Sequence, residues 1–266
     1  MKSRSLQSKL FFAYISLACL ILFSFAVFFY AFVSRQLKQS QISAMNTLNS
    51  SFQTQVDSAI RNLDAVSVNI NYSNQSKTIL DNSFNLNISS NMLSAMSDLF
   101  ISLSGTELKA DQVNLYDFSG YVLEAGISTI VKKTDGSKDE WIEVARELEG
   151  KKVLTPPYCT REYTKTATYD QWFISLYRSF NNQYKRGVVI ETAKQCKSVF
   201  KSIITYKKKN HEDAASIYVF DSNGDLIYPY DISQEYKAAL QPYYELTKGD
   251  DSALTFISPL TGKTEY

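Results

Sequence analysis

Apolar and polar positions divide the chain into a long uncharged run, a striped polar stretch and a series of short β-type segments. From Leu10 to Ser34 no charged residue occurs, and about 20 apolar residues are enough to cross a bilayer core of about 30 Å. Lys2 and Lys9 lie before this run, and cytoplasmic flanks carry an excess of basic residues. We therefore expect a membrane-spanning helix, with residues 1–9 in the cytoplasm.

Two other interpretations of the apolar run are less favoured. A cleaved signal peptide has a shorter apolar region and a small-x-small cleavage site, which this run lacks. Lipoprotein processing at Cys19 is disfavoured because Ser16-Leu17-Ala18 lacks the usual leading Leu and apolar sequence continues after it. No second apolar run of this length follows, so an uncleaved anchor would leave residues 35–266 on the extracellular side of the plasma membrane.

The polar stretch after the span carries an apolar stripe. Its members recur at steps of three and four, which marks one face of a helix, and they are Met45, Leu48, Phe52, Val56, Ala59, Leu63, Val66 and Ile70. No Pro or Gly occurs between Met1 and Leu103, so nothing interrupts this helix. The stripe fits either packing against a domain core or a dimer seam, and the sparse flanking charges favour the core. A second helix is predicted over 91–103.

Two later segments share one pattern, "VNLYDFSGYVLEAG" at 113–126 and "IYVFDSNGDLIYPY" at 217–230. Asp117 and Gly120 of the first align with Asp221 and Gly224 of the second. Aromatic and β-branched residues favour strands, while the Asp can bond its own backbone at a turn and the Gly accepts positive φ. Each segment is therefore predicted to form a β-hairpin, and their common register indicates a duplicated module.

Further elements are expected on either side of the second hairpin. They are a helix over 139–149, strands over 171–180 and 186–193 joined across Asn181-Asn182, helices over 194–207 and 233–248, and a last strand pair with a turn at Leu260–Gly262. The second module then has fewer strands than the first. We expect it to be incomplete, as in a truncated reading frame or a fragment.

Charge and cysteines narrow the classes of partner and cofactor. The net charge is +1, so nucleic acid is not expected as a partner. The basic run Lys207-Lys208-Lys209 fits a solvated linker. Cys159 and Cys196 could pair only if the fold brings them close, and two free thiols are favoured. No Cys-x-x-Cys motif or Cys/His cluster occurs, so no metal or other cofactor is predicted.

The order of these segments resembles the extracellular double Cache (tandem PAS-like) sensor region of bacterial YesM-type sensor histidine kinases. The residues that carry the resemblance are "SLQSKLFFAYISLACLILF" at the start, the "LYDFSG" and "IYVFDSNGDLIY" hairpins, and "WFISLYRSF" with "RGVVIE". It implies an α+β fold in which a transmembrane helix continues into a long stalk helix, followed by two Cache modules with antiparallel sheets. The implied domains are a cytoplasmic start at 1–9, the transmembrane helix at 10–34, stalk and long helices at 35–103, a membrane-distal module at 104–207 and a truncated membrane-proximal module at 208–266.

The same resemblance implies a sensory function without catalysis in this chain. The family continues through a second span and a HAMP segment to a kinase core, none of which is present here. His211 lies in a linker between the modules, where it cannot act as a phospho-accepting histidine. We expect the input region of a two-component histidine kinase acting as a homodimer. A Cache sensor of a chemoreceptor, cyclase or AraC-type regulator is the alternative, as is an anchored extracytoplasmic hydrolase, although no Gly-x-Ser-x-Gly or HExxH signature occurs.

The resemblance also places a small-molecule site against the sheet of the distal module. Such a pocket needs aromatic walls and a few convergent polar groups, and the candidates are Tyr116, Trp141, Tyr158, Arg161, Tyr169, Asp170, Trp172 and Arg178. A place in the core is the alternative for Tyr116, Trp141 and Trp172, and a surface position for Arg178. Arginine suits a carboxylate, and aspartate an ammonium group.

The ligand class stays open between a sugar, an amino acid and an organic acid. Cache domains that bind amino acids carry an Arg-x-Trp motif, whereas this chain has Asp170-Gln171-Trp172, which weighs against an amino acid. The abundance of tyrosine, 18 residues, suits stacking on a sugar or an aromatic ligand.

Overall fold

The computed structural model describes most of the chain. The described residues are 6–83, 90–105, 108–116, 120–133, 140–160, 170–181, 187–210, 216–247, 256–258, 262 and 264–265. They belong to two compact units, one formed by residues 1–51, 251–256 and 264–266 and the other by residues 52–250 and 257–263.

The secondary structure is mixed α and β. The helices are α1 (Leu6–Tyr72), α2 (Asn74–Ser83), α3 (Ser90–Ser104), α4 (Glu140–Glu147), α5 (Cys196–Val199), α6 (Lys201–Asn210) and α7 (Gln234–Thr247). The strands are β1 (Gln112–Tyr116), β2 (Tyr121–Gly126), β3 (Val131–Lys133), β4 (Lys152–Leu154), β5 (Tyr158–Thr160), β6 (Gln171–Asn181), β7 (Gly187–Gln195), β8 (Val219–Phe220), β9 (Leu226–Tyr228), β10 (Phe256–Ile257) and β11 (Thr264–Glu265).

The first unit contains the apolar part of α1. Its large side chains from Leu10 to Phe32 are exposed, and an 18-residue window of this helix has a mean hydropathy of 2.5. Among the described residues, this helix alone is long and apolar enough to cross a membrane. This finding is consistent with the expected membrane anchor, and a signal sequence near the N-terminus has the same properties.

The second unit is built around an antiparallel sheet. Its strands lie in the order β3-β2-β1-β7-β6-β4, and β5 also pairs with β6. The long central pair β6 and β7 runs from Phe173 opposite Gln195 to Asn181 opposite Gly187. The predicted hairpin is therefore present. Asn181, which the prediction placed in the turn, is the last paired residue of β6, and Asn182 lies outside the described residues.

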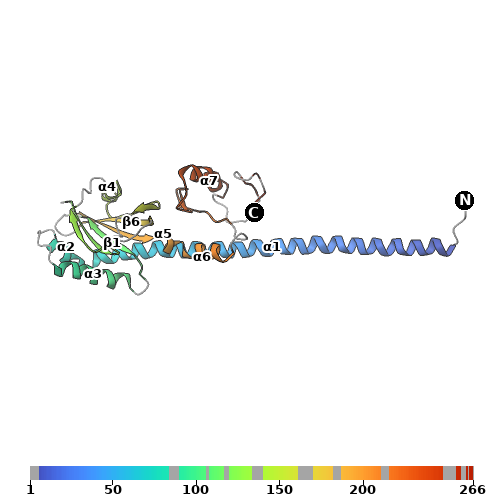
Figure 1. The fold of residues 1–266 in the computed structure, drawn as a ribbon, viewed down its shortest axis with the longest axis horizontal. Coiled ribbons are helices and arrows are strands. Elements are labelled where there is room, and N and C mark those ends of the chain that lie inside the picture. Colours follow the sequence, from blue (N-terminus) through green and yellow to red (C-terminus); the bar gives the residue numbers. More distant parts are fainter. Residues whose placement is uncertain are drawn as a thin grey trace. The chain divides into compact units, whose positions relative to one another are not determined.

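Helices cover the two faces of this sheet unequally. Figure 1 shows α2, α3 and the end of α1 along one face and α4 against the other. Leu63, Val66 and Ile70 of α1 are at most 1% exposed and share a core cluster with Leu115 and Ile190 of the sheet. From Phe52 to Ile70 the apolar stripe thus packs against a domain core, as favoured, whereas Met45 is exposed. A fully buried leucine side chain stabilises the fold by roughly 1.5–3 kcal/mol relative to an exposed one, so this face supplies much of the stability.

The other predicted helices are also present, with small differences at their ends. The segment predicted as one helix over 194–207 forms two, α5 and α6, which meet at Phe200. Phe200 is fully buried. None of Cys19, Cys159 and Cys196 forms a disulfide, which confirms the favoured interpretation that Cys159 and Cys196 do not pair with each other. His211 lies outside the described residues.

The second hairpin has the turn chemistry that the sequence predicts. The Asp221 carboxylate accepts hydrogen bonds from the backbone N–H groups of Asn223 and Asp225, each at 2.9 Å. Gly224 has φ +92°, and a Cβ there would lie 2.5 Å from the Tyr244 ring. In the first hairpin Gly120 also has positive φ, +80°, while residues 117–119 lie outside the described residues. Both glycines therefore take the backbone conformation for which glycine is suited.

Substitution of Gly224 by alanine should cost stability in two ways, through backbone strain at positive φ and through a steric clash with Tyr244. We expect Gly224→Ala to lower the free energy of unfolding by about 2 kcal/mol, because left-handed backbone costs a non-glycine residue roughly 1–2 kcal/mol and the new methyl group displaces Tyr244. Gly105 is the matched control, since its φ is +63° and no atom lies within 4 Å of the position that a methyl group would take, and Gly105→Ala should cost about 1 kcal/mol. Chemical denaturation of both variants measures the difference. Equal losses would contradict a steric role for Tyr244.

Candidate functional site

The face of the sheet turned away from α1 carries a set of buried polar side chains. Successive side chains of a strand point to opposite faces, so Gln112, Asn114 and Tyr116 of β1 lie on this face while Val113 and Leu115 pack in the apolar core on the other. Gln112 and Asn114 are at most 1% exposed. Buried polar groups need hydrogen-bond partners, and these side chains of β1 find theirs on the neighbouring strands and on one another.

Strand register places four of the polar-face residues in one row across the sheet. Asn114 of β1 stands opposite Glu124 of β2 and opposite Glu191 of β7. Glu191 in turn stands opposite Tyr177 of β6. All four are buried, and Glu191 is 0% exposed. The row therefore holds two carboxylates, one on each side of an asparagine.

Glu191 is the centre of the hydrogen bonds on this face. Its Oε2 accepts from Asn114 Nδ2 and from the Tyr116 hydroxyl, each at 2.7 Å. Its Oε1 accepts from the Ser175 hydroxyl at 2.6 Å and from the Tyr158 hydroxyl at 3.0 Å. Side chains from three other strands, β1, β5 and β6, thus converge on a single carboxylate, which fixes where each of them points. We call these five residues the Glu191 cluster.

The Glu191 cluster continues along β1 toward the loop after β2. Gln112 Nε2 donates to Asn114 Oδ1 at 2.9 Å and to the Ser128 carbonyl at 3.0 Å, and the Ser128 N–H donates to Gln112 Oε1 at 3.0 Å. The Asn114 side chain is thus held on both sides. The members of such a network are energetically coupled, so the cost of removing one of them is not a simple sum over its contacts.

An aromatic group borders the Glu191 cluster on the side of α4. The rings of Tyr116 and Tyr177 stack with centroids 6.4 Å apart, and Trp141 of α4 packs in the same cluster with Ile142 and Ala145. Tyr116, Trp141 and Tyr158 are half-buried. Oriented polar groups beside aromatic rings are typical of small-molecule sites. No group of three or more metal-ligating side chains occurs among the described residues.

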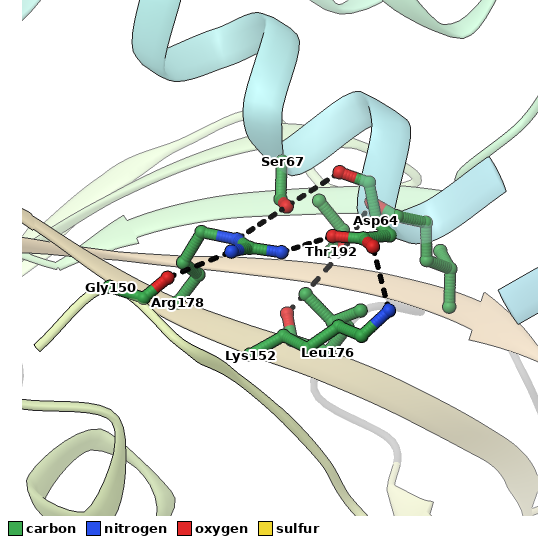
Figure 2. A network of polar contacts seen from close by, with 8 residues as sticks. Asp64, Ser67, Gly150, Lys152, Leu176, Arg178 and Thr192 are labelled. Atoms are coloured by element: carbon green, nitrogen blue, oxygen red, sulfur yellow. Dashed lines mark hydrogen bonds and ion pairs between the residues drawn. The ribbon is translucent and has the colours of Figure 1, made fainter. Parts of the chain in front are cut away.

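The opposite face of the same strands carries an ion-pair network, shown in Figure 2. Arg178 of β6 pairs with the Asp64 carboxylate of α1. It also donates from Nη1 to the Gly150 carbonyl at 2.8 Å and from Nε to Ser67 Oγ at 3.3 Å. Lys152 of β4 donates to Asp64 Oδ2 at 2.7 Å. We call Asp64, Ser67, Lys152 and Arg178 the Asp64 clamp.

The clamp should make stability fall at low pH. Burial acts to raise the pKa of Asp64, but the hydrogen bond from Lys152 and the positive charges of Arg178 and Lys152 outweigh it, so the pKa lies below the ordinary value of 3.8. A carboxyl with a lowered folded-state pKa contributes stability above its unfolded-state pKa and loses it as the pH falls through the folded-state pKa. The unfolding free energy of Asp64→Asn should therefore approach that of the unsubstituted chain below about pH 4. Denaturation at about pH 6 and about pH 3 measures this, and a constant difference would contradict it.

The structure brings together three of the residues that the sequence marked as site candidates. Tyr116 and Tyr158 both bond to Glu191, and Trp141 packs beside Tyr116. These three remain the candidates that share one face of the sheet.

Other candidates lie elsewhere. The Arg178 side chain points to the α1 face of the sheet, where it forms an ion pair with Asp64. It therefore lies on the opposite face from Tyr116 and Tyr158. Trp172 lies on the same face as Arg178, since residues at every second position of a strand share a face and both Trp172 and Arg178 hold even-numbered positions of β6. The Trp172 ring lies 5.8 Å from that of Tyr230. Asp170 is exposed just before β6. Arg161 and Tyr169 lie outside the described residues.

Sequence reasoning missed Glu191, Asn114, Glu124 and Ser175. Glu191 stands in "GVVIETA", and charged residues are almost never fully buried unless they are paired. A carboxylate inside an apolar strand was therefore a usable signal. The alternation of Gln112 and Asn114 with apolar residues was a second one.

Comparison with known proteins gives structural matches only. No protein-family model matches the sequence, and no curated protein matches it. The extracellular domain of the putative histidine kinase vpHK1S-Z8 matches with a TM-score of 0.53 and 12% identity over 80% of each chain. A domain of a putative sensory box/GGDEF family protein from Vibrio parahaemolyticus matches with a TM-score of 0.52 and 12% identity over 74% of each chain. The ligand-binding domain of the Campylobacter jejuni chemoreceptor Tlp3 with L-valine has a TM-score of 0.44, 14% identity, and coverage of 82% of this chain and 86% of that one.

Together with the sheet described above, the two matches above 0.5 define the class of fold. The chain has a long apolar N-terminal helix followed by the antiparallel sheet of a Cache, or PAS-like, sensory fold of mixed α and β structure. At 12% identity these matches show the fold alone, so the function has to be argued from the site.

Proposed function

We propose that the chain is the membrane-anchored extracellular input region of a sensor histidine kinase of the YesM type, and that it binds a small molecule. The apolar part of α1 would anchor it, with the N-terminus in the cytoplasm and residues 35–266 outside. Residues 104–207 would form the membrane-distal module and 208–266 the proximal one. Two copies would act as a homodimer. The histidine-kinase neighbour supports this output, while the GGDEF neighbour supports a Cache sensor of another transducer as the alternative.

The observation that carries the proposal is the Glu191 cluster. A protein that needed this sheet only as a core would lose little stability with apolar residues here, because replacing both partners of a buried hydrogen bond by apolar groups of the same shape can be nearly neutral or stabilising. Here a carboxylate instead orients Tyr116 and Tyr158, whose rings are half-buried beside Trp141. We propose these three aromatic residues, with Asn114 and Glu191, as the ligand contacts.

A thermal-shift screen of the purified full chain in detergent tests the proposal. The compounds are sugars, oligosaccharides, amino acids, amines and organic acids. A ligand at one hundred times its Kd stabilises the folded state by about 2.7 kcal/mol, which raises the melting temperature by several degrees. We expect at least one class to do so. A folded sample that responds to none of them would oppose direct small-molecule sensing.

Two conservative variants locate the site once a compound is found. Tyr158→Phe removes only the hydroxyl that bonds Glu191, and we expect it to reduce the thermal shift. Trp172→Phe is the matched control, since Trp172 lies on the other face of the sheet, and it should retain the shift. The reverse pattern would move the site to the α1 face.

A further inference from the structure

One turn of α1 makes polar contacts with three different strands. Asp64 binds Arg178 of β6 and Lys152 of β4, and the Leu63 carbonyl accepts from Thr192 Oγ1 of β7 at 3.2 Å. Ser67 adds its hydroxyl to the Arg178 guanidinium. Figure 2 shows these contacts converging on the helix from the sheet below it. The described contacts of α1 with the core clusters on either side of this turn are apolar.

The difference between polar and apolar contacts matters for where the helix can sit. Apolar burial is not directional, so the stripe of α1 could pack on the sheet in more than one position along the helix axis. Polar contacts depend on distance and angle. One turn away from Asp64 in either direction stand Ile60 and Val68, which offer Arg178 no carboxylate. The Asp64 clamp therefore selects one axial position.

The Asp64 clamp contains two positive charges and one negative charge, so its electrostatic stabilisation depends on the single carboxylate of Asp64. Lys152 and Arg178 stand directly opposite each other on neighbouring strands, and like charges in this position repel. One carboxylate binds both. The Arg178 side chain is 14% exposed and that of Asp64 is 25% exposed, so water screens the pair only in part. Loss of Asp64 would leave two opposed cations beneath the helix.

Two strands link the Glu191 cluster to the helix, since β6 carries Ser175 of the cluster and Arg178 of the clamp, and β7 carries Glu191 and Thr192, which bonds the Leu63 carbonyl of α1. On β6, Tyr177 faces the cluster and the next residue, Arg178, faces the helix. On β7, Glu191 is followed in the same way by Thr192. A displacement of either strand by a ligand on one face therefore moves a helix contact on the other face, with a single peptide bond between them.

From these contacts we infer that the Asp64 clamp is a latch that holds α1 in one axial position on the sheet, and that opening it is the conformational step by which the bound ligand is reported along α1. The inference rests on the proposed sensory function. In the open state α1 moves by one turn, about 5.4 Å, onto an alternative packing of its apolar stripe. Transitions of this kind between discrete packings are a common form of switching.

The experiment measures the helix position without any ligand. Spin labels are placed at two exposed positions, Asn69→Cys on α1 and Glu147→Cys on α4, in the full chain in detergent with Cys19→Ser and Cys159→Ser. Pulsed electron paramagnetic resonance should give one distance for the latched chain. With Asp64→Asn added, we expect a second distance, changed by several ångströms, whose population rises about tenfold or more. A single unchanged distance in a folded Asp64→Asn chain would overturn the inference.

Two further variants complete the test. Glu143→Gln breaks an ion pair of similar type on α4, between Glu143 and Arg146 at 2.5 Å, and it should leave the single distance. Arg178→Lys keeps the charge but loses the planar fork, and it should give an intermediate second population. If Asp64→Asn does not fold, Arg178→Lys decides the matter, since a single distance there would overturn the inference. Because no ligand is used, this result and that of the thermal-shift screen can fail independently.

Discussion

Replacement of Phe200 by alanine should destabilise the chain by about 3–5 kcal/mol, the range for removing a buried aromatic side chain. Phe200 is 0% exposed. Its ring lies 5.0 Å from that of Tyr228 and 5.9 Å from that of Tyr230, and it shares a core cluster with Val56 of α1 and Ile174 of β6. The side chain therefore fills the junction at which α1, the large sheet and the second hairpin meet. Urea denaturation of the full chain in detergent measures the loss.

An exposed aromatic residue gives the matched control for Phe200. Tyr72 at the end of α1 is 74% exposed, and Tyr72→Ala should change the free energy of unfolding by less than about 0.5 kcal/mol. Amide hydrogen exchange distinguishes a loss of stability confined to this junction from a loss throughout the second unit. Because the Glu191 cluster has no member in this junction, Phe200→Ala should raise amide exchange first in β8 and β9. Uniform acceleration through the large sheet would contradict a role specific to the junction.

Replacement of Glu191 by leucine should lower the free energy of unfolding by about 3 kcal/mol. The substitution keeps the volume but removes the acceptor used by Asn114, Tyr116, Tyr158 and Ser175, and each buried donor left without a partner costs about 1–3 kcal/mol. The expected loss is smaller than the sum for four donors because the three hydroxyl groups can rotate toward one another. Any ligand found in the screen should also lose affinity, since nothing then orients the tyrosines. Denaturation and thermal-shift titration measure the two effects.

Removal of the donors together with the acceptor tests whether the network is the cause. Replacing both partners of a hydrogen bond by apolar groups can be nearly neutral. Tyr116→Phe and Ser175→Ala added to Glu191→Leu should therefore recover part of the stability, although each lowers it in the unsubstituted chain. Strictly additive losses would show that Glu191→Leu acts through packing instead. Glu147→Gln on the exposed surface of α4 serves as the control and should have no measurable effect.

The backbone elements could largely be predicted from sequence because their patterns are local. The stripe from Val56 to Ile70 has a helical period, and the turn at Asp221 and Gly224 contains its own hydrogen bonds, so both are encoded within a few residues. The end of β6 was predicted one residue too early, because asparagine is a good turn residue, yet Asn181 pairs with Gly187 of β7. There the pairing with β7 decides the boundary, and turn propensity alone does not reveal that pairing.

The site was harder to predict because it depends on which face of the sheet each residue occupies. Tyr116 and Tyr158 were found as aromatic residues, but their common partner Glu191 lies on a third strand, and only the register reveals the meeting. Arg178 was a candidate for the ligand site because arginine suits a carboxylate ligand, with a surface position as the alternative. Its partner Asp64 is 114 residues away in sequence, on a helix, and no spacing rule connects them.

The same distance along the chain has a consequence for synthesis. The contact between Leu63 and Thr192 spans 129 residues, and at about 5–20 residues per second a ribosome needs roughly ten seconds to cover that span. During that time the apolar stripe of α1 has emerged while the strands that bury it do not yet exist. A nascent chain of this protein should therefore need a chaperone that shields the stripe, and it should reach its native state only after β7 has been made.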